Sequence, residues 1–235
     1  MKINTIELFK GEYEAEGLTD LELASEVIIA KSYGLDYLIK ISGCEAVRDI
    51  NIVRALGIKS VVCPMIESSF AMQKYMKLID GMEFNEVGVT IETKTAVKNV
   101  QEILDAGIRL TNVTIGRSDL ASSMEINNVN SSAVFDAVAQ VAEYSKKRNL
   151  IVTMGGGINV ETKNILLDDH PLCKLLDKIE TRKAVMSLNS FLNTSGLEDA
   201  IELEHFLLSR RLFEMESNIP ILKERMTGIH SRLLK

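Results

Sequence analysis

The sequence predicts an α/β fold, a (β/α)8 barrel with a C-terminal helical extension. The first reason is that Gly34, Gly57, Gly81 and Gly107 are 23, 24 and 26 residues apart, and each ends a stretch with helical periodicity. The second is that each glycine precedes a short run rich in valine and isoleucine, which is typical of strands covered on both faces. A doubly wound open sheet is the alternative, although no GxGxxG motif follows a first strand.

Short, largely apolar runs of residues are predicted as strands. In chain order they lie near residues 6–16, 36–42, 60–67, 86–93, 112–119, 150–157 and 179–188. The run near 6–16 is more polar than the others, and the run near 179–188 is the last one that can be identified. These runs account for seven strands, and the sequence does not locate an eighth.

Helix signals occupy the segments between these runs. Thr19 and Glu22 have the spacing of a capping box, and Ser68 or Ser69 can cap a later helix. Residues 94–106 place apolar side chains on one face, as expected for a helix that lies on a sheet.

The C-terminal part of the chain, about residues 197–235, is predicted as a helical region interrupted by Pro220. Apolar residues recur in it at near-helical spacings, and they exceed what one face of a barrel needs. They are Leu203, Phe206, Leu207, Leu208, Leu212 and Phe213. No linker separates this region from the rest, so we expect a single domain over residues 1–235.

Composition excludes several classes of protein. The net charge is −6 and no basic block is present, so we expect no nucleic-acid partner. No apolar run approaches the length of a membrane span, so we expect no membrane partner. Cys44, Cys63 and Cys173 are too widely spaced for a zinc site or a disulfide framework. A cytoplasmic protein in a reducing compartment fits these features best.

Two acids end neighbouring predicted strands, about one strand–helix unit apart. Glu92 ends the run "EVGVTIET", and Asp119 lies just past the strand in "NVTIGRSD". In a parallel barrel the carboxyl ends of the strands share one opening, where chemistry gathers. Oxygen ligands from two such acids suit Mg²⁺ or Mn²⁺, with water and substrate in the remaining positions. The alternative is that both acids only stabilise the starts of helices.

Three motifs, "PMIESSFAM", "VTIETKTAVKNVQEILD" and "IGRSDLASSM", occur in the order and spacing of one family. Over about residues 36–125 the chain resembles the HpcH/HpaI aldolase and citrate lyase β-subunit family. The resemblance implies a (β/α)8 barrel that uses a divalent metal, Mg²⁺ or Mn²⁺, to bind pyruvate or phosphoenolpyruvate as an enolate. It also implies a lyase or aldolase that makes or breaks a carbon–carbon bond of a 2-oxo acid.

The same resemblance assigns expected roles to individual positions. Glu92 and Asp119 match the metal ligands of the family. Lys40 falls where many members carry an arginine that contacts the oxo and carboxylate oxygens of the substrate. The expected substrate-binding positions, which include the main chain that receives the pyruvate carboxylate, are Lys40, Thr90, Gly116, Arg117 and Ser118.

The general base is the point where the chain departs from the family. Aldolase members carry a histidine in a "GEH" motif, whereas this chain reads "KGEYEAEG" and has Tyr13 at that position. The catalytic candidates in this segment are therefore Glu12, Tyr13 and Glu14, beside Lys40. Alternation along a strand would put Glu12, Glu14 and Glu16 on one face, where crowding raises the pKa of a glutamate toward the range of a general base.

The histidines of the chain offer no better candidate for the base. His170, His205 and His230 all lie in predicted helix or tail segments.

Two other functions stay open from the sequence. Lys40 or Lys183 could act as a Schiff-base nucleophile, which needs no metal. A barrel without its histidine could also act as a binding or assembly protein. In the resembled family a C-terminal helix packs across subunits, and we therefore expect a homo-oligomer.

Overall fold

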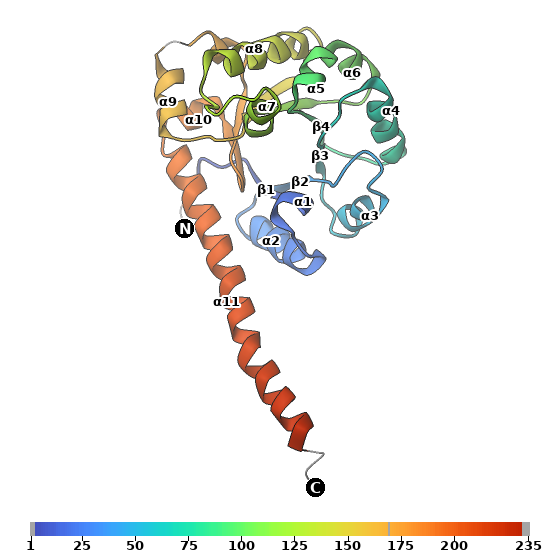
Figure 1. Ribbon diagram of the computed structural model, residues 1–235, viewed down its shortest axis with the longest axis vertical. Helices are drawn as coiled ribbons and strands as arrows, with labels where there is room; N and C mark the ends of the chain where they lie inside the picture. The colour runs from blue at the N-terminus through green and yellow to red at the C-terminus, as the bar shows by residue number, and fades with distance from the viewer. Residues whose placement is uncertain (1–2, 169, 232–235) are drawn as a thin grey trace.

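The computed structural model describes residues 3–168 and 170–231, and its centre is a closed barrel of eight strands in chain order (Figure 1). The strands are β1 (Leu8–Glu12), β2 (Asp36–Lys40), β3 (Ser60–Cys63), β4 (Glu86–Ile91), β5 (Asn112–Gly116), β6 (Ile151–Gly155), β7 (Lys178–Glu180) and β8 (Ala184–Ser187). Strands β1 to β7 pair in parallel, whereas β8 runs antiparallel to both β7 and β1. The predicted α/β barrel is confirmed.

The eighth strand lies within the last predicted run. Residues 179–188 form a hairpin instead of one strand, and the main-chain N–H of Thr181 donates to the carbonyl of Ala184 at 2.8 Å. The single strand expected there was wrong because the turn between β7 and β8 contains neither Gly nor Pro, the residues that mark turns in a sequence. A hairpin strand closes the barrel without the helical crossover that a parallel strand requires.

Helices cover the outside of the barrel, as Figure 1 shows. They are α1 (Tyr13–Glu16), α2 (Asp20–Ser32), α3 (Val47–Ala55), α4 (Ser69–Leu78), α5 (Lys94–Lys98), α6 (Val100–Ala106), α7 (Arg117–Ser123), α8 (Ser132–Lys146), α9 (Val160–Leu167), the 3-10 turn η1 (Pro171–Lys174), α10 (Leu188–Asn193) and α11 (Gly196–Ser231). The predicted capping box of Thr19 and Glu22 is present, and Ser68 caps α4. The helix expected over 94–106 is divided at Asn99.

The first predicted strand is shorter than expected. Strand β1 ends at Glu12, and the helical turn α1 begins at Tyr13 and ends against Gly17, which has a φ of +56°. The expected strand face shared by Glu12, Glu14 and Glu16 was therefore wrong. Helical geometry rotates successive side chains by about 100°, so the three carboxylates point in different directions.

Side chains inside the barrel form layers of different character. Leu8, Leu38, Val62 and Val185 make a small buried apolar cluster that belongs to the lumen. Two residues further along β1 and β2, the inward positions carry Lys10 and Lys40. Alternation along each strand thus places a polar layer above an apolar one, at the end of the barrel where enzymes of this architecture do their chemistry.

The C-terminal helix α11 continues without a break through Pro220, so the interruption expected at Pro220 was wrong. The helix starts beside the barrel and projects away from it along the longest axis of the molecule (Figure 1). Within residues 3–168 and 170–231, no helix is both long and apolar enough to cross a membrane.

Candidate functional site: the mouth of the barrel

The carboxyl ends of the strands surround a cavity of about 410 Å³, referred to below as the mouth cavity. Its charged lining residues are Lys10, Glu12, Lys40, Glu92, Asp119, Glu180, Arg182 and Glu204. Uncharged positions include Thr90, Thr114, Gly116, Ser118 and Gly156. The cavity therefore brings together Lys40, Glu12, Glu92 and Asp119, as well as the predicted substrate positions Thr90, Gly116 and Ser118.

Glu92 occupies the centre of this arrangement. It follows β4 directly and is only 2% exposed. Its Oε1 accepts the main-chain N–H of Met65 at 3.0 Å, and its Oε2 lies 3.4 Å from Lys40 Nζ. Gly116 makes room for it, because a Cβ at that position would lie 2.9 Å from Glu92 Oε2. Burial raises the pKa of Glu92, and the nearby charge of Asp119 raises it further, against the opposing effect of Lys40.

Asp119 lies in the first turn of α7, which begins where β5 ends. Its side chain is exposed and lines the same cavity as Glu92. Across the described residues, no group of three or more His, Cys, Asp or Glu side chains could hold a metal ion. Two carboxylates with room for water and substrate oxygens still suit Mg²⁺, which is commonly bound by one or two carboxylates. The donor set thus fits a hard divalent ion.

A chain of ion pairs links the first two strands across the mouth. Lys10 pairs with Glu12, and with Glu180 at 2.8 Å, while Lys40 lies 3.7 Å from Glu12 Oε2. Burial alone would raise the pKa of Glu12, but the charges of Lys10 and Lys40 outweigh it and lower this pKa. The rise in pKa expected from crowding was therefore wrong for Glu12, which is a carboxylate at neutral pH.

Lys10 was not predicted as a site residue. For Lys10 the sequence held a signal, since it alternates with Glu12 along β1 and must share its face. Burial would lower the pKa of Lys10, but Glu180 and Glu12 raise it above the usual value, so the side chain is a fixed ammonium.

Three threonines form a row on adjacent strands. Thr90 on β4 is in register with Thr114 on β5, which is in register with Thr153 on β6. Thr114 Oγ1 is buried and has no hydrogen-bond partner among the described atoms. Because Thr114 lines the mouth cavity, its hydroxyl is available to a bound ligand. Thr114 was not predicted, because in the sequence it looks like an ordinary strand threonine.

The side chain of Arg117 turns away from the mouth cavity. It is fully buried and donates to the carbonyl of Gly156 at 2.9 Å, to Asn130 Oδ1 at 2.9 Å and to Thr162 Oγ1 at 3.2 Å. Burial lowers the pKa of Arg117 to about 10. The guanidinium therefore holds the turn after β6 in place, and only the main chain of Arg117 remains for the predicted binding role.

That turn lies directly against the start of α7. A Cβ on Gly156 would lie 2.5 Å from the main-chain nitrogen of Ser118 and 2.7 Å from that of Arg117. Only glycine fits there, and its φ of +78° also favours glycine. Glycine thus allows the close approach of this turn to the start of α7, where Gly156 and Ser118 both line the mouth cavity.

Tyr13 and Glu14 are not among the residues that line the mouth cavity. Glu14 is exposed on α1. Burial, together with the charges of Asp20 and Asp49, raises the pKa of Tyr13 to about 12. Of the three base candidates in this segment, only Glu12 reaches the cavity.

No histidine is found in the lining of the mouth cavity either. His170 caps η1 and His205 is exposed on α11, while the side chain of His230 lies outside the described part of the chain.

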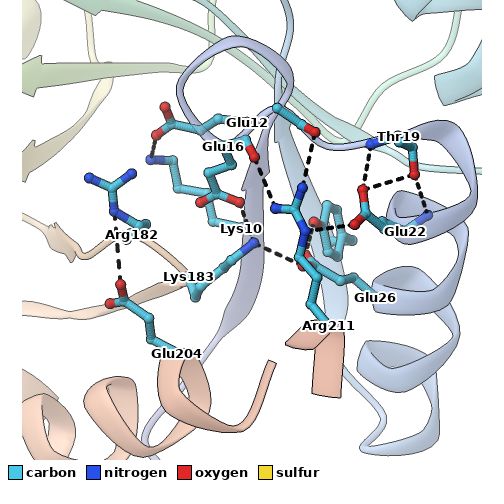
Figure 2. A network of polar contacts seen from close by, with 12 residues as sticks. Lys10, Glu12, Glu16, Thr19, Glu22, Glu26, Arg182, Lys183, Glu204 and Arg211 are labelled. Carbon is cyan, nitrogen blue, oxygen red and sulfur yellow. Dashed lines mark hydrogen bonds and ion pairs between the residues drawn. The ribbon is translucent and has the colours of Figure 1, made fainter. Parts of the chain in front are cut away.

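Lys183 belongs to a separate buried cluster, shown in Figure 2. Its Nζ pairs with Glu16, and with Glu26 Oε1 at 2.9 Å. Glu26 also accepts a hydrogen bond from Tyr37 at 2.5 Å. From α11, Arg211 donates to the carbonyl of Glu16 at 3.0 Å, so this cluster fastens the helix to the barrel. Lys183 does not line the mouth cavity.

A parallel barrel with a polar, charged cavity at the carboxyl ends of its strands has the architecture of a barrel enzyme. The HpcH/HpaI aldolase/citrate lyase family model matches residues 26–164, which is more than half of the chain. The chain belongs to this family, whose members are lyases and aldolases.

Solved structures agree on the fold. A HpcH/HpaI aldolase/citrate lyase family protein from Burkholderia cenocepacia J2315 has a TM-score of 0.63 and 15% identity, over 90% of this chain and 86% of that chain. A HpcH/HpaI aldolase from Desulfitobacterium hafniense DCB-2 has a TM-score of 0.58 and 15% identity, over 69% and 73% of the two chains. A citrate lyase β subunit from M. tuberculosis, solved with oxaloacetate and magnesium, has a TM-score of 0.55 and 13% identity, over 73% and 79%. No curated protein matches the sequence.

Proposed function

We propose that the protein is a metal-dependent lyase or aldolase that acts on a 2-oxo acid and binds pyruvate or phosphoenolpyruvate as an enolate. One observation carries this proposal: Glu92 and Asp119 line the same cavity as Lys40. A barrel that served only as a scaffold would gain nothing from burying a carboxylate at an electrostatic cost.

The metal ion would be Mg²⁺ or Mn²⁺, held by the carboxylates of Glu92 and Asp119. A bound divalent ion supplies positive charge that polarises the ketone of a 2-oxo acid and stabilises negative charge on its oxygen. The citrate lyase β subunit of M. tuberculosis, solved with magnesium and the 2-oxo acid oxaloacetate, supports this choice of ion and ligand.

Lys40 supplies the second positive charge. Its ammonium lies between Glu12, at 3.7 Å, and Glu92, at 3.4 Å, in the lining of the mouth cavity. Negative charge that develops on the ketone oxygen during enolate formation is stabilised by a cation held in a fixed position. Lys40 is placed to do this.

The carboxylate of the substrate would bind beside the turn that follows β6. Gly156 and Ser118 line the mouth cavity there, and α7 begins with the main-chain N–H groups of Arg117 and Ser118. Main-chain N–H groups are good donors to an anionic oxygen. The partnerless hydroxyl of Thr114, and Thr90 beside it, add hydrogen-bonding groups on the adjacent strands.

Glu12 is the best-placed general base. In the proposed step, its carboxylate takes a proton from the methyl carbon of pyruvate. The electron pair of that C–H bond becomes the carbon–carbon double bond of the enolate, and the carbonyl π electrons move onto the ketone oxygen. The enolate carbon then forms a bond to the carbonyl carbon of a second substrate while the ketone of pyruvate re-forms. The π electrons of the second carbonyl move onto its oxygen, which takes the proton held by Glu12; cleavage is the reverse sequence.

Exchange of the methyl protons of pyruvate into D₂O, followed by NMR, tests the proposal. We expect exchange that depends on added Mg²⁺ or Mn²⁺ and stops with excess chelator. Proton exchange that persists in excess chelator, together with borohydride trapping of pyruvate on Lys40, would contradict the metal-dependent mechanism and indicate a Schiff base instead. Absence of exchange under every condition would favour a binding or assembly protein.

A further inference from the structure

Most of α11 extends beyond the barrel. The helix has 36 residues, which at about 1.5 Å per residue is roughly 54 Å. Its first part packs on the barrel through the buried side chains of Leu197, Ala200, Leu203 and Leu207. From Leu208 to Glu224, every residue except Arg211 is exposed. Figure 1 shows this part of the helix pointing away from the rest of the molecule.

The exposed part carries a regular apolar pattern. Seven large apolar residues are exposed between Leu208 and Glu224, and five of them lie four, three, four and three residues apart, at Leu208, Leu212, Met215, Ile219 and Leu222; Phe213 and Ile221 are the other two. All five are exposed, with fractions of 49%, 56%, 60%, 47% and 55%. Alternating steps of four and three are the heptad repeat of a coiled coil, in which Leu212 and Ile219 take position a and the others take position d.

The register of this pattern can be followed in both directions. Downstream, Met226 holds the next a position. Upstream, the a position is the polar His205 and the d position is Ile201, which lines the mouth cavity, so the apolar repeat spans residues 208–226. This 4–3 spacing is what the seam of a coiled coil requires.

The heptad face is different from the face that packs on the barrel. With about 100° of rotation per residue, Leu203 at position f is nearly opposite the a/d stripe, and Ala200 and Leu207 at position c lie well away from it. Docking of α11 on its own barrel thus uses one side of the helix and leaves the a/d stripe facing solvent. Pro220, at position b, also lies off the stripe.

We propose that the a/d stripe of α11 pairs with the same stripe of a second copy of the chain, in a parallel two-stranded coiled coil. The regular repeat specifies another helix as the occupant, since only a helix presents side chains at matching intervals. A second copy supplies an identical stripe through two-fold symmetry.

Light scattering after gel filtration tests the pairing with a matched pair of variants of the full chain. Ile219 lies on the stripe and Ile221 lies off it, and the two have similar exposed fractions of 47% and 51%. We expect the wild type to have the mass of two 26.1 kDa chains. Ile219→Glu should weaken the dimer by about 100-fold or more, because it puts an unpaired charge into an apolar seam. Ile221→Glu should stay a dimer.

Leu212→Glu, a second substitution on the stripe, should weaken the dimer in the same way as Ile219→Glu. Circular dichroism verifies that each variant keeps its helical content. A monomeric wild type at tens of micromolar, or equal masses for Ile219→Glu and Ile221→Glu, would overturn the proposal.

Cross-linking decides between α11 pairing in parallel and α11 packing on the barrel of another copy. Leu222→Cys places a thiol at a d position, where two parallel helices in register bring identical residues together. Mild oxidation should give a covalent dimer for Leu222→Cys, and not for Ile221→Cys or for the wild type with its own three cysteines. A dimer in which Leu222→Cys does not cross-link rules out the parallel pairing.

Discussion

Lys40 Nζ lies 3.4 Å from Glu92 Oε2, so the lysine and the proposed metal ion would share the carboxylate of Glu92. A divalent ion bound at Glu92 would be repelled by this ammonium, because two positive charges a few ångströms apart interact strongly in a partly buried site. The same ammonium would stabilise an enolate. In the proposed mechanism, Lys40 would therefore weaken metal binding while promoting the reaction.

Lys40→Met separates these two effects. We expect the affinity for Mn²⁺, measured by calorimetry, to rise by up to about tenfold as the repulsion is removed. The rate of pyruvate proton exchange should fall by about 100-fold or more. A loss of metal affinity in this variant would show that Lys40 supports the metal site and does not oppose it.

The identity of the base can be tested with three substitutions in one segment. Glu12→Gln should abolish proton exchange with metal affinity retained, because Glu12 alone of the three candidates lines the mouth cavity. Tyr13→Phe and Glu14→Gln should keep the wild-type rate. With a pKa of about 12, Tyr13 is almost entirely protonated at neutral pH and cannot act as a base there.

The pH dependence of exchange gives an independent check on Glu12. Its pKa is lowered below the ordinary value, so the carboxylate form persists as the pH falls and is lost only below the usual glutamate range. The part of the pH profile that depends on Glu12 should therefore be flat through neutral pH. Unchanged exchange in all three variants would place the base elsewhere.

Gly156→Ala tests the proposed carboxylate site. The new methyl group would clash with the main-chain nitrogens of Arg117 and Ser118 and force the start of α7 to shift, so we expect the affinity for oxalate or pyruvate to fall by about tenfold or more. Gly81→Ala is the control, since Gly81 has a similar φ of +67° but no atom within 4 Å of the added Cβ. Both variants carry backbone strain, and only the first crowds the site. Equal affinities of the two variants for oxalate or pyruvate would show that the substrate carboxylate does not bind at this position.

Lys183→Met should destabilise the fold. The lysine is buried between Glu16 and Glu26, and its removal leaves two buried carboxylates without their cation. We expect a loss of about 3 kcal/mol in the free energy of unfolding by urea. The exposed Lys98→Met should change it by less than about 0.5 kcal/mol. A stable Lys183→Met variant that loses proton exchange would instead make Lys183 a Schiff-base candidate again.

The features that the sequence could predict are those that depend on local pattern. Strand–helix alternation and capping residues indicate the barrel, and the ends of parallel strands share one opening. Glu92, Asp119 and Lys40 each lie at or just past the end of a predicted strand. The barrel topology alone is therefore enough to place these three residues at one site.

Features that depend on contacts between distant segments could not be predicted. Glu16 pairs with Lys183, 167 residues away, which no periodicity reveals. Arg117 points into the protein because Phe135, Asn130 and the carbonyl of Gly156 surround its guanidinium, although its neighbour Ser118 lines the cavity. That the buried hydroxyl of Thr114 has no hydrogen-bond partner among the described residues likewise depends on all the atoms around it, which come from distant segments.

The boundary between β1 and α1 is a local feature that the sequence nevertheless did not predict. Alternating glutamates are typical of a strand with one polar face, but the chain turns into α1 after Glu12 and separates the three carboxylates. Propensity alone does not locate such a boundary to within one or two residues, because glutamate is acceptable in both states at an exposed position.

Calorimetric titration with Mn²⁺ is the sharpest test of a divalent-metal site formed by Glu92 and Asp119. The wild type, Glu92→Gln, Asp119→Asn and the control Glu204→Gln, whose carboxylate lines the same cavity, would be titrated under identical conditions. We expect one site in the wild type and in Glu204→Gln, with binding lost in Glu92→Gln and Asp119→Asn while both variants remain folded by circular dichroism. Unchanged Mn²⁺ affinity in both Glu92→Gln and Asp119→Asn would show that these carboxylates do not form the metal site.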